Sequence, residues 1–268
     1  MLRQLIATIL LLPTFGSAQD IDKEKPVAPP VVHTRIGDQA TSSDGSFTIT
    51  LVAKKQNYDW SGAVKRDPDV VSPKSVNISP DGKKFYINSL EGAKTVCYDM
   101  ASGDKLSTVS HVIGRRHRQL WTGAEDIYPF DTVYSKPRVF TGKPVEGAFS
   151  HRGRYLWIPY YRRSYDLNAQ DPSAIAVIDT RGDSIVRLLD TGPLPKMIAE
   201  SPDGRYMAVA HWGNNTVGII DIKSDQPDQW RQLPYHVVDY KMKLNYSRTE
   251  PVNRDVGSGN ALRGTVFT

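Results

Sequence analysis

The chain has 268 residues, of which 39% are hydrophobic, and its 34 Lys and Arg residues against 29 Asp and Glu residues give a formal net charge of +5. This composition excludes a wholly disordered chain and a low-complexity chain. The single cysteine excludes an internal disulfide framework and a four-cysteine metal site. Because basic and acidic residues are interspersed, the mild positive charge does not indicate nucleic-acid binding.

Residues 1–18 have the layout of a secretory signal peptide. Arg3 precedes an apolar run from Leu5 to Leu12, and the small residues of Gly16-Ser17-Ala18 suit a signal peptidase. The alternative is a membrane anchor, but the run is shorter than the roughly 20 apolar residues that span a bilayer. No later segment of the sequence is apolar enough to span a membrane. We therefore expect cleavage near Ala18 and a secreted or periplasmic protein.

Residues 19–45 are polar and rich in proline, as in Ala28-Pro29-Pro30. Such a stretch buries too little apolar surface to order itself, which predicts a disordered linker. The rest of the chain, 46–268, is the predicted folded part.

The folded part contains an internal repeat. Ser79-Pro80-Asp81-Gly82 recurs as Ser201-Pro202-Asp203-Gly204 and, more weakly, as Ser150-His151-Arg152-Gly153. A proline stands nine residues before the glycine of each copy, and each copy is followed by an apolar segment that ends in an aspartate: Asp99, Asp179 and Asp221. Several anchors at fixed offsets indicate one unit repeated near 73–110, 144–191 and 195–233.

Each unit is predicted to hold four strands. The Asp-Gly pair suits a hairpin turn because glycine accepts positive φ, and the residues after it, such as Phe85-Tyr86-Ile87, favour strands. Four strands in about forty residues is the size of a propeller blade. The repeated aspartates are interpreted as structural turn acids, and Cys97 as a small core residue.

These motifs resemble the YVTN-type (YncE-like) β-propeller repeat family of secreted bacterial proteins. The resemblance rests on the spacing of Pro to Ser-Pro-Asp-Gly and on the run from Asn214 to Asp221, and it covers roughly residues 73–233. The Tyr-Val-Thr-Asn positions are degenerate, as in Tyr86-Ile87-Asn88-Ser89. The resemblance implies an all-β fold, a β-propeller of four-stranded blades, and it leaves the function open because propellers serve many unrelated tasks.

Three complete repeats do not close a propeller, which usually has four to eight blades. Residues 262–268 resemble 145–150, the start of a repeat, and 47–52 form a lone strand of the kind that closes the ring in many propellers. We therefore expect about three complete blades plus partial ones in an incomplete ring, from a truncated copy of a longer protein. The alternative is a short propeller completed by a second chain.

The family pattern places three long insertions, 111–143, 160–173 and 234–262, on one face, opposite the Asp-Gly turns. Long loops on a rigid scaffold often carry binding sites, and these are rich in aromatic residues such as Trp121, Tyr128 and Phe130. The candidate ligand-binding residues on this face are basic or aromatic: Arg115, Arg116, Tyr160, Tyr161, Arg162, Arg163, Lys74, Lys196, His211 and Trp212.

Arginine offers paired donors to a carboxylate or phosphate, and tyrosine can stack on a sugar or aromatic ring. The alternative interpretations are a solvated basic run for 115–118, an exposed hairpin for 160–165 and a hydrogen-bonded loop residue for His211. No second histidine stands at ligand spacing from His211, so neither a metal site nor a cofactor is predicted.

Two functional classes remain open from the sequence. The first is an exported binding or scaffold protein that presents a loop-rich, aromatic and basic face to a small molecule, glycan or protein. The second is a propeller enzyme, such as a lactonase-like hydrolase or a haem or quinone oxidoreductase subunit. An enzyme needs acids or histidines that converge on the insertion face, for which the sequence offers Glu125, Asp126, Glu146 and His211. A non-functional fragment is the third possibility.

Overall fold

The computed structural model describes residues 35–54, 67–121, 127–130, 137–257 and 262–267. The predicted signal peptide and the linker up to residue 34 lie outside these ranges. The chain divides into two units, Met1–Val52 and Ala53–Thr268, each of which is described by itself.

The first unit contains a β-hairpin. Strand β1 (Gln39–Thr41) pairs antiparallel with β2 (Thr48–Thr50), and all residues of both strands are exposed. The turn suits its sequence because Asp44 Oδ1 accepts a hydrogen bond of 2.6 Å from Ser42 Oγ, and Gly45 takes a φ of 70°. The linker prediction therefore fails at residues 39–41, and the expected lone strand over 47–52 has β1 as its partner in the hairpin.

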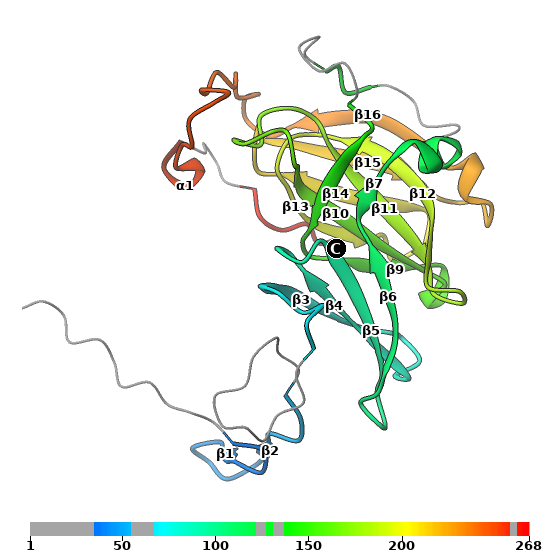
Figure 1. Ribbon diagram of the computed structural model, residues 1–268, viewed down its shortest axis with the longest axis vertical. Coiled ribbons are helices and arrows are strands. Elements are labelled where there is room, and N and C mark those ends of the chain that lie inside the picture. The colour runs from blue at the N-terminus through cyan, green and yellow to red at the C-terminus, as the bar shows by residue number, and fades with distance from the viewer. Residues whose placement is uncertain (1–34, 55–66, 122–126, 131–136, 258–261, 268) are drawn as a thin grey trace, which may run out of the picture. The chain divides into compact units, whose positions relative to one another are not determined.

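Among the described residues, the second unit is built from three antiparallel sheets, two of four strands and one of six (Figure 1). The first blade comprises β3 (Pro73–Ile78), β4 (Lys84–Ser89), β5 (Lys94–Asp99) and β6 (Lys105–Ser110), in that spatial order. Another blade comprises β13 (Pro195–Glu200), β14 (Tyr206–His211), β15 (Thr216–Asp221) and β16 (Arg231–Val237), again in chain order. A sheet whose strands follow one another in chain order is the propeller blade that the repeats predict.

The middle blade has an irregular inner edge. Its regular strands are β10 (Tyr155–Arg163), β11 (Ser173–Asp179) and β12 (Ser184–Thr191). The inner edge of β10 pairs first with β9 (Ala148–Ser150) and then with β8 (Phe140–Pro144), which in turn pairs with β7 (Val112–Ile113). Because β10 has nine residues against six in β4 and β14, it extends beyond β9 and supports the 111–143 insertion.

The repeated turn residues act as the sequence predicts. Gly82 and Gly204 both have a φ of 68°, and the serine hydroxyl of each turn donates to the aspartate, over 2.7 Å from Ser79 to Asp81 and 2.6 Å from Ser201 to Asp203. The strand-ending aspartates each accept a backbone hydrogen bond two residues on: Asp99 from Ala101, Asp179 from Arg181 and Asp221 from Lys223. The all-β propeller fold with about three complete blades is confirmed.

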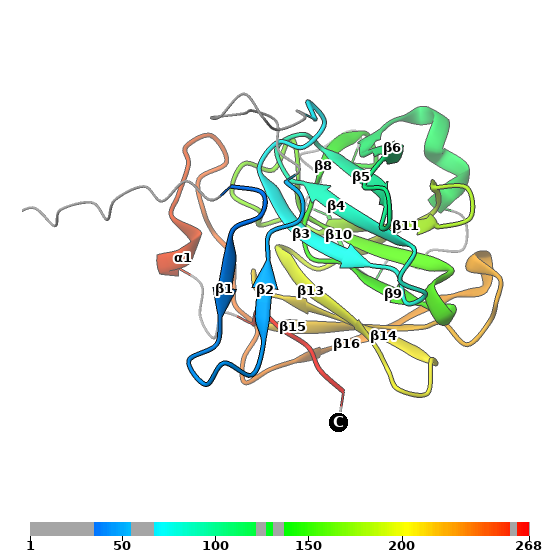
Figure 2. The same ribbon diagram turned by 90° about the horizontal axis from the view of Figure 1, so that it is seen from below.

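Neighbouring blades are held together by buried apolar side chains, and Figure 2 shows the three sheets in succession. Tyr86 and Cys97 of the first blade pack in one cluster with Leu156 and Ile158 of the middle blade. A second cluster joins the middle blade to the third one through Tyr155, Trp157, Met207 and Val209, among other residues. Burial of these side chains supplies the main stabilisation, at about 25 cal/mol per Å² of apolar surface.

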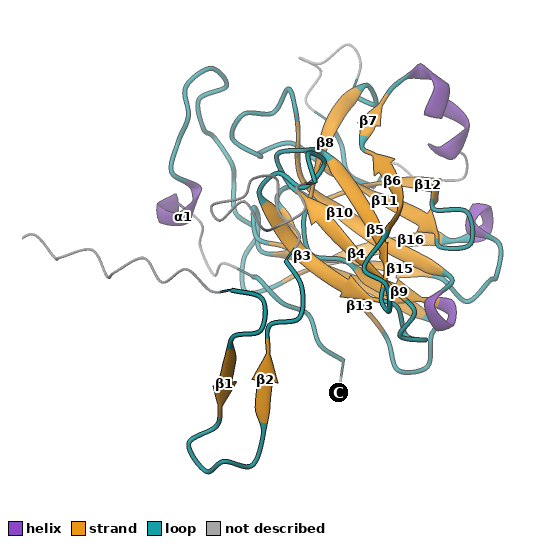
Figure 3. Cartoon of the chain, turned by 60° about the horizontal axis from the view of Figure 1, so that its bottom comes forward, coloured by secondary structure: helices purple, strands orange, loops and turns teal. Residues whose placement is uncertain are grey.

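Helical segments are short (Figure 3). They are the 3-10 helices η1 (Arg115–Trp121), η2 (His151–Gly153) and η3 (Pro227–Gln229), and the α-helix α1 (Arg254–Gly257). In the described ranges, no helix has the length and apolarity needed to cross a membrane.

Candidate functional site

Four of the predicted ligand-binding residues are buried: Tyr160, Arg163, His211 and Trp212. Tyr160 is fully buried, and its hydroxyl lies 2.9 Å from His111 Nδ1, whose Nε2 lies 2.7 Å from Thr95 Oγ1. Because β10 packs between two blades, this tyrosine faces the core and offers no surface to a ligand. The prediction is wrong at Tyr160 for that reason.

His211 ends β14 inside a hydrogen-bonded network. Its Nε2 lies 2.7 Å from Thr191 Oγ1 and its Nδ1 lies 2.7 Å from Thr216 Oγ1. Complete burial lowers the pKa of His211 to about 3, so the ring is neutral. His211 is thus the hydrogen-bonded residue of the alternative interpretation. The described part of the chain contains no group of three or more His, Cys, Asp or Glu residues arranged for a metal ion.

Three of the predicted residues come together in one stack. The Lys196 ammonium lies 4.4 Å from the centre of the Trp212 ring and 4.9 Å from that of Tyr161. The Arg263 guanidinium also lies over Trp212, at 4.5 Å. Trp212 is buried against Ala169 and Leu194. The stack is therefore a cation–π cluster whose rings are already in contact with the chain's own cations.

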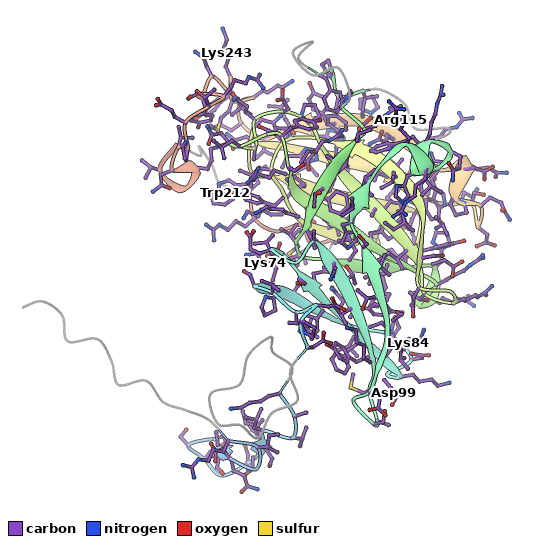
Figure 4. All side chains as sticks on the ribbon, in the orientation of Figure 1. Lys74, Lys84, Asp99, Arg115, Trp212 and Lys243 are labelled. Carbon is purple, nitrogen blue, oxygen red and sulfur yellow. The ribbon has the colours of Figure 1, made fainter. Side chains whose placement is uncertain are left out.

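The remaining predicted residues are dispersed. Lys74 pairs with Glu146 over 3.5 Å, and Arg162 donates to the backbone carbonyl of Asp166 over 3.1 Å. Arg115 and Arg116 are exposed on η1. Figure 4 shows Arg115 well away from Lys74 and Trp212. The predicted set is therefore divided among several places on the molecule, and the possible catalytic acids Glu125 and Asp126 lie outside the described residues.

A hollow lies in the 111–143 insertion. It is a cavity of about 900 Å³ between η1 and the segments that lead into β8. Its lining combines arginines with aromatic and apolar side chains: Gly114, Arg115, Arg118, Trp121, Tyr128, Pro129, Phe130, Pro137, Arg138 and Val139. We call it the insertion cavity. Arg115 is the one predicted site residue that lines it.

The wall of the insertion cavity is braced by a buried ion pair. Arg163, at the end of β10, is 1% exposed and donates to the carboxylate of Asp190 and, over 2.8 Å, to the carbonyl of Ser173. It also donates to the carbonyl of Pro137, which lies in the cavity lining. Arg138 reaches the other oxygen of Asp190 over 2.9 Å. Arg163 thus lies in the interior, where it holds Pro137 of the cavity lining, and not on the exposed face on which the sequence predicted it.

Cation–π contacts hold the aromatic lining in place. The Arg163 guanidinium lies 4.5 Å from the Phe130 ring centre, and Arg138 lies 4.9 Å from that of Trp121. Trp121 is 5% exposed, and its indole Nε1 is buried with no hydrogen-bond partner among the described residues. A buried donor without a partner is costly in a folded protein, and a ligand acceptor in the cavity would satisfy it.

Tyr128 connects the insertion cavity to the third blade. Its ring stacks on Tyr235 with a centroid distance of 5.7 Å and meets the edge of His211 at 5.5 Å. Burial raises the pKa of the Tyr128 phenol well above its usual range, so it is protonated. The insertion thus packs on a rigid part of the propeller.

Sequence reasoning noted Arg118 as part of the basic run 115–118 but missed Arg138. It noted Trp121, Tyr128 and Phe130 as aromatic residues of the loops and did not single them out as a site. The available signal was the density of arginine and aromatic residues within the single insertion 111–143. What was missing was the way that β7 and β8 bring the two ends of this insertion together.

No protein-family description matches the chain. A curated relative, antigen Lp49 of Leptospira interrogans, is 21% identical over 199 residues, which are 65% of this chain and 43% of the antigen. The chain thus spans less than half of that relative's length.

Among solved structures, hydrazine synthase of Kuenenia stuttgartiensis aligns with a TM-score of 0.45 and 19% identity, over 68% of this chain and 40% of that one. A proposed 6-phosphogluconolactonase of Bacteroides uniformis aligns with a TM-score of 0.43 and 18% identity, over 64% of this chain and 42% of that one. The WD40 repeats of RRP9 align with a TM-score of 0.43 and 11% identity, over 64% of this chain and 40% of that one. Because the scores are this low, the propeller assignment rests on the strand order of the sheets themselves.

Proposed function

We propose that the protein is an exported β-propeller that binds, in its insertion cavity, a ligand with an anionic group and an aromatic or apolar portion. The observation that supports this proposal is the lining of the cavity. Arg115 and Arg118 provide cations, Arg138 is paired with Asp190, and no acidic residue lines the described part of the cavity. Trp121 and Phe130 provide flat apolar surface beside these cations.

The chemistry of recognition follows from these two kinds of residue. Arginine binds carboxylates and phosphates through paired N–H donors. Aromatic walls take the apolar portion of a ligand by stacking and by removing it from water. A volume of about 900 Å³ is at the upper end of the size of small-molecule sites. The ion pair of Arg163 with Asp190 keeps this lining ordered before the ligand arrives, which lowers the entropic cost of binding.

The proposal is tested by calorimetric titration of the chain with benzoate and with benzyl alcohol as its neutral analogue. We expect benzoate to bind and benzyl alcohol to bind at least tenfold more weakly. The double variant Arg115→Gln/Arg118→Gln should weaken benzoate binding at least tenfold. Arg231→Gln, which removes an exposed arginine from β16, is the matched control and should change nothing. Equal affinity for the two probes, no binding of either, or equal loss in the control variant would refute the proposal.

Export is a separate part of the proposal and has its own test. N-terminal sequencing of protein recovered from outside the cytoplasm should begin after Ala18. Recovery of a chain that keeps Met1 in the membrane fraction would contradict it.

A further inference from the structure

The first turn of the middle blade departs from the repeat in charge. In the other two blades this turn is Ser-Pro-Asp-Gly, whereas in the middle blade it is Ser150-His151-Arg152-Gly153. The position of Asp81 and Asp203 is thus occupied by Arg152. A turn that forms well with aspartate in two blades has no folding need for an arginine in the third.

The backbone of this turn is also different. His151 has a φ of 52°, Arg152 of 57° and Gly153 of 90°, so three consecutive residues are left-handed. In the other two turns, only the glycine has a positive φ. Left-handed residues other than glycine are costly and are concentrated at functional sites. The different backbone thus accompanies the different sequence at His151 and Arg152.

Neighbouring groups hold the strained turn in one geometry. His151 Nδ1 lies 2.8 Å from Ser150 Oγ, and His151 Nε2 lies 3.0 Å from the carbonyl of Ser224 in the third blade. The backbone N–H of His151 donates to Glu200 Oε1 over 3.1 Å, and its ring packs 5.2 Å from that of Tyr155. These contacts fix the backbone from which the Arg152 side chain extends.

Arg152 lines a second cavity, of about 570 Å³, formed by turns of all three blades. We call it the turn cavity. Its lining is mostly polar: Ser79, Pro80, Asp81, Lys84, Tyr86, His151, Arg152, Gly153, Arg154, Thr180, Arg181 and Asp225. It shares no lining residue with the insertion cavity. Figure 4 shows Lys84, from this lining, away from Arg115.

The cations of the turn cavity differ in how they are paired. Lys84 lies 3.4 Å from Asp183, and Arg154 Nε lies 3.6 Å from Asp179, which is too long for a hydrogen bond. Arg154 Nε is buried and has no hydrogen-bond partner among the described residues. The exposed side chains of Arg152 and Arg181 make no hydrogen bond and no ion pair within the part of the chain that the structure describes.

Two carboxylates line the same cavity. Asp81 Oδ1 accepts hydrogen bonds from Ser79 Oγ over 2.7 Å and from the backbone N–H of Lys83 over 3.1 Å, so one of its two oxygens is engaged in its own turn. The other is Asp225, from the loop between β15 and β16. The cations of the lining thus outnumber its two carboxylates, which leaves arginine donors for an anion.

We propose that the turn cavity binds an oxyanion, the phosphate or carboxylate group of a small ligand, through Arg152 and Arg181, with Arg154 Nε as a further donor. Guanidinium groups suit this role because they present paired N–H donors to two oxygens of one anion. The proposal is independent of the ligand assigned to the insertion cavity, because the two cavities use different residues.

The test is calorimetric titration of the chain with inorganic phosphate and with acetate at low ionic strength. We expect at least one of the two to bind, and the probe that binds identifies the source of the oxyanion. Arg152→Gly and Arg181→Gln should each weaken that binding at least tenfold. Arg231→Gln, which lies on β16 and lines neither cavity, should leave it within twofold.

Two further measurements separate binding from folding. Arg152→Gly removes the guanidinium but also relieves the left-handed strain, so its denaturation midpoint should be equal to or higher than that of the wild type while binding is lost. Arg205→Gln is the matched control, because Arg205 follows the corresponding turn of the third blade and does not line the cavity. No binding of either probe, unchanged binding in Arg152→Gly, or equal loss in Arg205→Gln would overturn the proposal.

Discussion

Two arginines of the middle blade are buried to almost the same degree but differ in how many hydrogen-bond partners their guanidinium groups have. Arg163 on β10 is 1% exposed and Arg187 on β12 is 2% exposed. The guanidinium of Arg163 donates to the Asp190 carboxylate and to two backbone carbonyls, and its Nε is buried with no partner among the described residues. The guanidinium of Arg187 has one long hydrogen bond of 3.4 Å, to the carbonyl of Trp230, and its Nε and Nη1 have no partner among the described residues. Burial lowers the pKa of Arg187.

The difference shows that burial alone does not tell whether a charge stabilises a fold. A buried charge that loses its partner costs several kcal/mol, whereas replacement of a poorly satisfied one by an apolar side chain is often neutral or stabilising. Arg163 is matched and also positions the lining of the insertion cavity, while Arg187 packs against the third blade with most of its donors unused. The four predictions that follow test this contrast, in order of decreasing effect.

The largest effect is expected for Asp190→Asn. This variant keeps the shape of the side chain but leaves Arg163 buried without its counter-charge, so the free energy of unfolding should fall by about 3–5 kcal/mol. Chemical denaturation measures it. Asp221→Asn, which alters a partly exposed turn aspartate, is the control and should cost about 1 kcal/mol or less. A loss below about 1 kcal/mol in Asp190→Asn would end the claim that Arg163 depends on Asp190.

The second prediction concerns buried bases that can lose their proton, as an arginine cannot. Burial lowers the pKa values of His111 and His211 to about 3, below the value of about 6.5 in the unfolded chain. Below pH 6.5 the unfolded state therefore binds more protons than the folded state. Stability is fully present above pH 6.5 and is lost as the pH falls toward 3, by about 1.4 kcal/mol per pH unit for each histidine.

Denaturation midpoints measured from pH 7 to pH 4 test this dependence. His211→Gln should flatten the slope by about one proton, although it lowers stability at pH 7. His236→Gln, which replaces an exposed histidine on β16, should leave the slope as it is. A wild-type stability that does not change between pH 6.5 and pH 4 would show that the two rings are not buried in the neutral form.

The third prediction compares two turn glycines, one with a positive φ and one without. Gly204→Val places a β-branched residue at a φ of 68°, which should cost about 1–2 kcal/mol. A Cβ at this position meets only Glu200 Oε1, at 3.7 Å, so the loss comes from the backbone and not from a clash. Gly182→Val, at an exposed glycine without positive φ, should cost less. Equal losses in urea denaturation would contradict the turn assignment.

The smallest effect is expected for Arg187→Met. An unbranched apolar side chain fills similar space without the desolvated charge, so the free energy of unfolding should stay the same or rise by about 1 kcal/mol. Differential scanning calorimetry resolves such a change in the melting temperature. A loss above about 2 kcal/mol would mean that Arg187 is matched as well as Arg163 is, and the contrast would disappear.

The repeat made the fold predictable because turn chemistry is local. The Asp-Gly turns and the aspartates that end the strands report their structure through hydrogen bonds between residues two or three apart. The hairpin of β1 and β2 was harder to foresee, because its strands are three residues long and fully exposed. A composition argument therefore assigned residues 39–41 to the linker.

The candidate site was predicted less well because it depends on which residues the topology brings together. Tyr160 to Arg163 read as an exposed aromatic and basic run, but β10 continues through this run and turns two of the four side chains inward. Arg138 and Arg163 meet at Asp190 from separate strands and loops, and no sequence spacing indicates this contact. The turn cavity could not be predicted for the same reason, because residues from three blades contribute to its lining.

Cys97 is a probe of the packing interface between the first blade and the middle blade. Its thiol is fully buried in the apolar cluster that the first blade shares with the middle blade, and burial raises its pKa to about 11. Because only the thiolate reacts with alkylating reagents, the folded protein should resist labelling at pH 8. The rate at which this single thiol is modified then reports how often the two blades separate, a local opening that a global melting curve averages away.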